Sequence, residues 1–169
     1  SLIATADAGA CLDTAQLECL EQSFRAWVAA ANRRDVEHSR RRILLIFLLI
    51  RQTGAKLSEV LALNPHTDIT EQTLCIRHPE GEEAACQRSI AISEQLAKEI
   101  QQALDEPDFS RSLTNLFAVD PAFVRRKFYE RAEACGIAKH MAGPEMIRRA
   151  RAVELMQSNM PLPAVQKLL

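Results

Sequence analysis

Basic residues occur in three dense clusters, and their chemistry suits a phosphate partner. A planar guanidinium matches two oxygens of a phosphate group, so grouped arginines can grip a phosphate backbone. Similar clusters also form ordinary solvated helix faces, and that interpretation stays open for each one. Because the formal net charge of the chain is −1, the clusters predict acidic surface elsewhere and one face suited to nucleic acid. The clusters are Arg33, Arg34, Arg40, Arg41 and Arg42; Arg125, Arg126, Lys127 and Arg131; and Arg148, Arg149 and Arg151.

Other site chemistries find no support in the residue pattern. The five glycines, at positions 9, 54, 81, 136 and 143, form no phosphate-binding loop. Cys75 and His78 form a C-x-x-H pair, but residues three apart on a strand face opposite sides, so zinc is not expected. The other histidines, His38, His66 and His140, are scattered, and no Ser-His-Asp arrangement is evident. We therefore expect no metal and no cofactor.

Length and composition indicate one folded domain. The 169 residues are 47% hydrophobic and 25% charged, which is enough to bury a core. The longest apolar run, Ile43–Ile50, is far shorter than the ~20 residues needed to span a bilayer. Five cysteines, an odd count with no tight pairing, indicate reduced thiols and a cytoplasmic protein with no membrane partner.

The apolar spacing predicts the helices that must position the basic clusters. Residues 1–12 are weakly patterned and are expected to form a flexible leader. Asp13 or Thr14 can cap a first helix, with Gln16 completing a capping box. Its apolar stripe recurs every three or four residues and consists of Leu17, Leu20, Phe24, Trp27 and Val28.

A second helix is expected to be the buried centre of the domain. It runs from Val36 to Gln52, after a break over Asn32–Asp35, and it is apolar nearly all round from Ile43. Gly54 ends it, because glycine takes the left-handed conformation at no steric cost.

The rest of the chain predicts a mainly α fold with a small antiparallel β-sheet, an α+β arrangement. Alternation predicts strands over Thr70–His78 and Arg88–Ile92. We expect a loop over Glu106–Leu113 and a brief extended piece at Leu116–Phe117. The remaining helices are expected over Leu57–Leu63 (closed by an Asn64-Pro65 turn), from Ser93 to about Leu104, from Asp120-Pro121 to near Gly136, from Pro144 to Asn159, and from Pro163 to Leu169.

Three stretches in order resemble one protein family. The segment LLIRQTGAKLSEVLAL, Leu48–Leu63, resembles the first signature of the tyrosine recombinases, the phage-integrase family. GPEMIRRARAVELMQSNMPLPAVQKLL, Gly143–Leu169, is similar to the second box of that family, and LDTAQLECL from Leu12 matches the usual start of its catalytic domain. The resemblance implies a recombinase catalytic-domain fold over residues 13–169, ending before the helix that carries the family's tyrosine.

The same resemblance implies a degenerate active site. In the family, two arginines hold the scissile phosphate, a histidine and a lysine move protons, and a tyrosine attacks phosphorus. Here Lys56 stands at the first arginine, Glu145 at the histidine, and Arg148 keeps the second arginine. The hairpin position of the lysine falls in Ala84-Ala85-Cys86. Because losing one charge-stabilising donor costs about 3–4 kcal/mol of barrier, no catalytic residue is expected.

Two further departures bear on mechanism. Tyr129, the one tyrosine in the sequence, lies on the helix before the second box, and the family's nucleophile position would fall beyond Leu169. The hairpin carries Glu80, Glu82 and Glu83, which would oppose its insertion beside phosphates. We also predict that Lys56, Glu145 and Arg148 meet in space, with the carboxylate paired to at least one base.

We therefore expect a catalytically inactive, integrase-like domain that binds double-stranded DNA in transcriptional regulation. The arrangement is similar to regulators that join such a domain to a molybdate- or tungstate-binding domain, which could follow Leu169. A homo-oligomer is compatible with this hypothesis. The residues expected to bind DNA are Arg40, Arg41, Lys56, Arg125, Arg126, Lys127, Arg148, Arg149 and Arg151.

Two alternatives remain open at this stage. One is an active site-specific recombinase in which Lys56 and Arg148 clamp the phosphate and a later tyrosine cleaves the strand. The other is a protein-interaction module, because family members exchange C-terminal helices between neighbours.

Overall fold

The computed structural model describes residues 11–77, 86–111, 116–158 and 160–169. It contains a three-stranded antiparallel sheet beside a set of helices, which confirms the predicted fold class. The helices are α1 (Thr14–Ala29), α2 (Arg34–Thr53), α3 (Leu57–Leu61), α4 (Pro65–Asp68), α5 (Glu94–Asp105), α6 (Pro107–Arg111), α7 (Pro121–Glu133), the 3-10 helix η2 (Lys139–Met141), α8 (Pro144–Gln157) and α9 (Leu162–Leu168).

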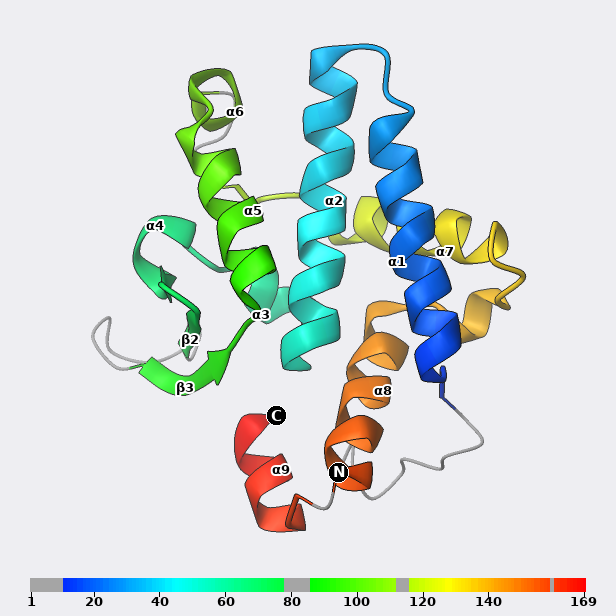
Figure 1. Cartoon of the computed structure of the whole chain (residues 1–169), viewed down its shortest axis with the longest axis vertical. Coiled ribbons are helices and arrows are strands. Elements are labelled where there is room, and N and C mark those ends of the chain that lie inside the picture. The colour runs from blue at the N-terminus through cyan, green and yellow to red at the C-terminus, as the bar shows by residue number, and fades with distance from the viewer. Residues whose placement is uncertain (1–10, 78–85, 112–115, 159) are drawn as a thin grey trace.

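Helix α2 forms the centre of the molecule. In Figure 1 it stands between α1 and α5, with α8 below it and the sheet to one side. Every residue from Ile43 to Ile50 is at most 4% exposed, so this half of the helix is covered on all sides, as its composition predicted. The helix starts at Arg34, two residues before the predicted Val36, and ends at Gly54.

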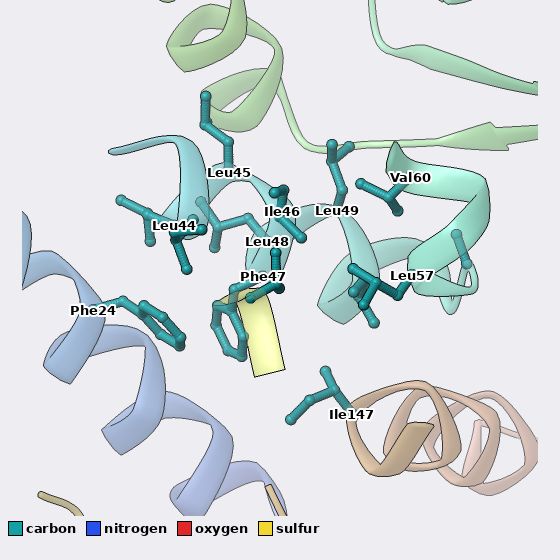
Figure 2. Packing of buried hydrophobic residues seen from close by; sticks show 14 of the residues in the cluster. Phe24, Leu44, Leu45, Ile46, Phe47, Leu48, Leu49, Leu57, Val60 and Ile147 are labelled. Carbon is teal, nitrogen blue, oxygen red and sulfur yellow. The ribbon is translucent and has the colours of Figure 1, made fainter. Parts of the chain in front are cut away.

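Helix α1 packs on α2 through the predicted stripe. Its capping box is present: the Gln16 amide donates to the Asp13 carboxylate at 2.7 Å, and the Asp13 amide donates to Gln16 Oε1 at 3.0 Å. Leu17, Leu20 and Phe24 are buried, and the Phe24 ring stacks on Phe47 of α2 at 4.7 Å. Figure 2 shows these two rings facing each other among the leucines and isoleucines of α2. Most of the expected leader, residues 1–10, lies outside the described residues, whereas Leu12 at its end is buried.

The sheet has the order β1–β2–β3, with β1 (Ile69–Thr70), β2 (Thr73–Arg77) and β3 (Cys86–Ala91). The single strand predicted over Thr70–His78 is in fact two, because the chain turns at Glu71, whose φ is +54°. Leu74 pairs with both Ile69 and Ile90, and this face of the sheet is buried. The predicted hairpin residues 78–85, including His78, lie outside the described residues.

A disulfide joins Cys75 of β2 to Cys86 of β3, with Cα atoms 5.6 Å apart. The interpretation of all five cysteines as reduced thiols is therefore wrong for this pair. The two residues are 11 positions apart, and only the pairing of the two strands brings them together. Cys75 is thus occupied by a disulfide rather than available to a metal.

Two segments expected to be irregular are helical. Asn64 caps α4, where a plain turn was predicted, by accepting from the His66 amide at 3.1 Å. Helix α6 lies within the predicted loop Glu106–Leu113, and its Phe109 is buried against the ring of His38 at 4.7 Å. The expected extended piece at Leu116–Phe117 is a turn, held by the burial of both side chains. Burial in tertiary contacts, which local pattern does not encode, decides these segments.

The described helices include none that is both long and apolar enough to cross a membrane. Helix α8 ends at Gln157, near the predicted Asn159, and α9 begins at Leu162, one residue before the predicted Pro163. Helix α9 returns to the end of α2, where the side chain of Leu169 lies against Gly54.

Gly54 and Gly136 offer a matched test of this contact. Both adopt positive φ, +71° and +69°, but a Cβ at Gly54 would collide with Leu169 whereas one at Gly136 would meet nothing within 4 Å. We expect each Gly→Ala change to cost ~1 kcal/mol of backbone strain. Gly54→Ala should cost ~1 kcal/mol more, because Leu169 must move. Urea unfolding measures both; equal losses would show that α9 does not pack on Gly54.

Candidate functional site

A cavity of about 400 Å³ lies where helices α3, α7 and α8 begin. Its apolar wall consists of Leu57, Pro121 and Pro144, one from the first turn of each helix. Its polar wall brings together residues from positions 56 to 148 of the chain: Lys56, Ser58, Arg125, Glu145 and Arg148.

Local sequence explains why the three helices begin there. Lys56 follows the left-handed turn at Gly54 and is the N-cap of α3. Pro121 and Pro144 occupy the first turns of α7 and α8, where proline lacks only an N–H that the helix does not use. Helix N-termini carry partial positive charge and N–H groups that attract an anion, although at α7 the Asp120 carboxylate already accepts from the Ala122 amide at 3.1 Å.

Arg148 is held by main-chain oxygens rather than by a carboxylate. Its Nε donates to the Gly54 carbonyl and a terminal nitrogen donates to the Leu169 carbonyl, each at 2.9 Å. Burial lowers the pKa of Arg148, nearby Glu59 raises it and Arg88 lowers it, leaving a net decrease. The guanidinium makes no ion pair with any described carboxylate, so its charge remains available to an anion in the cavity.

Glu145 forms an ion pair with Arg125 at 2.8 Å. Burial acts to raise the pKa of this carboxyl, but the hydrogen bond from Arg125, the backbone amide at the start of α8 and the charge of Arg125 outweigh it and lower the pKa. The Glu145 side chain is 67% exposed and faces the cavity as an anion.

Lys56, Glu145 and Arg148 therefore share one cavity, as the sequence predicted. The predicted partner of the carboxylate is different: Glu145 pairs with Arg125 rather than with Lys56 or Arg148. Arg148 lies against Gly54 and Leu169 instead, and α7 presents Arg125 to the start of α8.

Glu59 and Arg88 form an ion pair close to Arg148. Glu59 accepts from the Lys56 amide at 2.8 Å and from Arg88 at 3.0 Å, and the two side chains are only 13% and 15% exposed. Burial acts to raise the pKa of Glu59. Hydrogen bonds from Arg88 and the Lys56 backbone lower it by more, so the net shift is downward. This bridge fixes the start of α3 to β3 and so positions Lys56.

Neither Glu59 nor Arg88 was expected at the site from the sequence pattern. The signal for Glu59 was its place three residues after the N-cap Lys56, the spacing of a capping box. No sequence signal identifies Arg88, because its contact with α3 depends on where the sheet packs.

Two of the residues expected to bind DNA hold helices together at the other end of α2. Arg40 donates to the Trp27 carbonyl at 2.7 Å and lies over the Trp27 ring at 5.1 Å. Arg41 pairs with Glu37 and Glu106, at 3.2 Å and 2.7 Å, and covers the ring of Phe109. Both lie outside the cavity wall.

The remaining expected DNA-binding residues lie along α7 and α8, beyond the cavity wall. Arg126 is exposed over the Phe123 ring at 5.3 Å, and Lys127 pairs with Glu130 at 3.1 Å. Arg149 is partly exposed, and Arg151 pairs with Glu154 at 3.3 Å. The structure thus gathers three of the nine predicted residues, Lys56, Arg125 and Arg148, around one cavity.

Other positions that bear on mechanism lie apart from the cavity or outside the described residues. Tyr129 is on α7, beneath Lys139 at 5.0 Å and beside Gly143, and it does not line the cavity. Ala84, Ala85 and the acidic hairpin residues Glu80, Glu82 and Glu83 are outside the described residues.

The described histidines do not line the cavity. His38 is buried and lies 3.2 Å from Glu106, whereas His66 and His140 are exposed. Within the described ranges, no group of three or more His, Cys, Asp or Glu side chains could hold a metal ion.

Comparison of the coordinates with solved structures identifies the fold. The chain is similar to the crystal structure of XerA recombinase, with a TM-score of 0.70 and 18% sequence identity. The match covers 94% of this chain and 53% of that one, so the chain spans about half the length of the recombinase. Neither a protein-family model nor a curated protein matches the sequence. The fold is therefore that of a tyrosine recombinase.

The Glu59–Arg88 bridge predicts an acid-dependent loss of stability. Glu59→Gln should lower the free energy of unfolding by about 2 kcal/mol at pH 7, because a mostly buried Arg88 loses its anion. The folded-state pKa of Glu59 lies below its ordinary 4.5, so the contribution is complete above that value and is lost as the pH falls through the folded pKa. The difference between wild type and variant should therefore shrink on acidification, measured by urea unfolding across pH.

Glu94→Gln is the matched control for this prediction. Glu94 pairs with Lys98, but the two side chains are 68% and 69% exposed, so solvent screens the pair. We expect a change of ~0.5 kcal/mol or less. A Glu59→Gln loss that stayed constant down to acid pH would show that the charge is not its source.

Proposed function

We propose that this chain is an integrase-like domain that binds double-stranded DNA without cutting it and acts in transcriptional regulation. The observation that carries the proposal is the convergence of Lys56, Arg125 and Arg148 on one cavity at the starts of α7 and α8. Guanidinium groups and helix N-termini are the donors that proteins use for phosphate. The likeness of the fold to a recombinase supports a phosphodiester as the anion.

Glu145 argues against strand cleavage. A carboxylate held ionised by Arg125 repels a phosphate and cannot donate the proton that a histidine at this position would. Lys56 is a point charge and cannot make the bidentate contact with a phosphate that arginine makes. The cavity can therefore attract a phosphate backbone but lacks the groups that would stabilise its cleavage.

The proposed role in transcriptional regulation rests on the domain binding DNA without cutting it. A domain that grips duplex DNA and leaves it intact acts by occupying a site. The proposal keeps the expected cytoplasmic location. An effector-sensing domain of the oxyanion-binding kind in a longer chain would make occupancy responsive to a ligand.

Binding of a labelled duplex, followed by fluorescence anisotropy at two NaCl concentrations, tests the proposal. Affinity should fall as salt rises, because bound phosphates release counterions. Lys56→Gln should weaken binding and reduce the slope of log affinity against log salt by about 1. Lys98→Gln, at another exposed lysine, on α5 and outside the cavity, should change neither.

Glu145→Gln provides the opposite change in the same assay. Removing the anion beside the bound phosphate should raise affinity about fivefold to tenfold, equivalent to ~1 kcal/mol. Salt-independent binding, no binding, or equal effects of Lys56→Gln and Lys98→Gln would each contradict the proposed DNA contact.

A nicked suicide duplex, which traps a covalent protein–DNA intermediate, tests the absence of cleavage. We expect no adduct on a denaturing gel, either with this chain or with a longer chain that contains it. Tyr129→Phe is the control for this chain, which has no other tyrosine. A trapped adduct would overturn the proposal in favour of an active recombinase.

A further inference from the structure

Two cysteines far apart in sequence face each other where α1 meets the end of α7. Cys19 and Ser23 are one turn apart on α1, and Arg131 and Cys135 are one turn apart at the end of α7. The Ser23 hydroxyl donates to the Arg131 carbonyl at 3.2 Å. The Cys135 thiol lies close enough to the side chains of Cys19 and Ser23 for both to shift its pKa. Cys19 and Ser23 of α1 thus lie alongside Arg131 and Cys135 at the end of α7.

Packing holds the two segments in this position. The buried rings of Phe24 and Phe128 meet edge to face at 5.5 Å, and Arg131 lies over the Trp27 ring at 5.0 Å. After α7 the chain turns tightly, with the Cys135 amide donating to the Ala132 carbonyl at 2.9 Å. Aromatic contacts and backbone hydrogen bonds therefore keep the thiols adjacent without any ligand.

Exposure distinguishes the two sulfurs. Cys19 is exposed, whereas Cys135 is partly buried. Burial first, and then the neighbouring Cys19, raise the pKa of the Cys135 thiol to about 11, with Ser23 and Arg131 acting in the opposite direction. Cys135 is thus protonated at neutral pH, and Cys19 is the sulfur that an oxidant from solvent reaches first.

We propose that Cys19 and Cys135 form a reversible disulfide site that hydrogen peroxide oxidises and small thiols reduce. The Cys19 thiolate attacks one peroxide oxygen, the O–O bond breaks, and Cys19 sulfenic acid and hydroxide form. The Cys135 sulfur then attacks the Cys19 sulfur; the S–O bond breaks, an S–S bond forms, and the Cys135 proton leaves with the hydroxyl as water. Two equivalents of a reducing thiol return both side chains to thiols.

The disulfide would act on the candidate site without touching it. Cys135 begins the segment that runs through η2 to Gly143 and Pro144, where α8 starts. Helix α7 also carries Arg125. Oxidation would therefore tie α1 to α7 and to the segment that leads into α8, two of the three helices whose first turns line the cavity.

Peptide mapping after peroxide treatment of the purified, reduced chain tests the proposal. Trypsin releases Cys135 in Ala132–Lys139 and Cys19 in Ser1–Arg25. We expect these two peptides linked, with the loss of two hydrogen atoms, after free thiols are alkylated, and separated again by dithiothreitol. The oxidised protein should also unfold at higher urea concentration than oxidised Cys19→Ser, which retains the Cys75–Cys86 disulfide.

Cys11 lies on the same tryptic peptide as Cys19 and supplies the matched control. Cys11→Ser should keep the link, and Cys19→Ser should abolish it while retaining the reduced protein's circular dichroism spectrum. A link that survives Cys19→Ser, thiols that stay alkylatable, or sulfinic acid at Cys19 in place of the disulfide would each overturn the proposal.

Discussion

The apolar half of α2 must be covered on every side, and the rest of the structure depends on this constraint. A helix whose residues 43–50 are all buried needs neighbours around its whole circumference, and α1, α3, α5, α7 and α8 supply them. The aromatic cluster of Phe24, Phe47 and Phe128 joins two of these helices, α1 and α7, to α2. Because α3 begins just after α2 ends at Gly54, and α8 packs on α2, the starts of α3 and α8 come together with that of α7.

This packing produces the electrostatic character of the candidate site. Helix N-termini and three cations meet at one cavity, while a single carboxylate, Glu145, is retained there by Arg125. Elsewhere several arginines are tied to carboxylates, carbonyls or rings, as Arg41 is to Glu106 and Arg51 is to Glu154. The same residue type therefore braces helices in one place and leaves charge available in another. Arg148 keeps its charge available because its guanidinium bonds main-chain carbonyls and no described carboxylate.

Features that depend only on residues near one another in the sequence could be predicted from it. The capping box at Asp13, the left-handed end of α2 at Gly54 and the proline starts of α7 and α8 all follow from short-range rules. Helix α6 and the Leu116–Phe117 turn did not follow, because burial of Phe109 and Phe117 decides them. The pairing of Cys75 with Cys86 escaped prediction for the same reason, since strand register sets it.

By itself, the amino-acid sequence determined the fold class, the buried centre at Ile43–Ile50 and the meeting of Lys56, Glu145 and Arg148. Periodicity, caps and motif order encode these properties. Only the tertiary structure decided the partners: Arg125 for Glu145, Arg88 for Glu59, and main-chain carbonyls for Arg148. A charged side chain takes its partner from whatever packing brings within about 4 Å, and that distance is a property of the folded chain rather than of spacing along it.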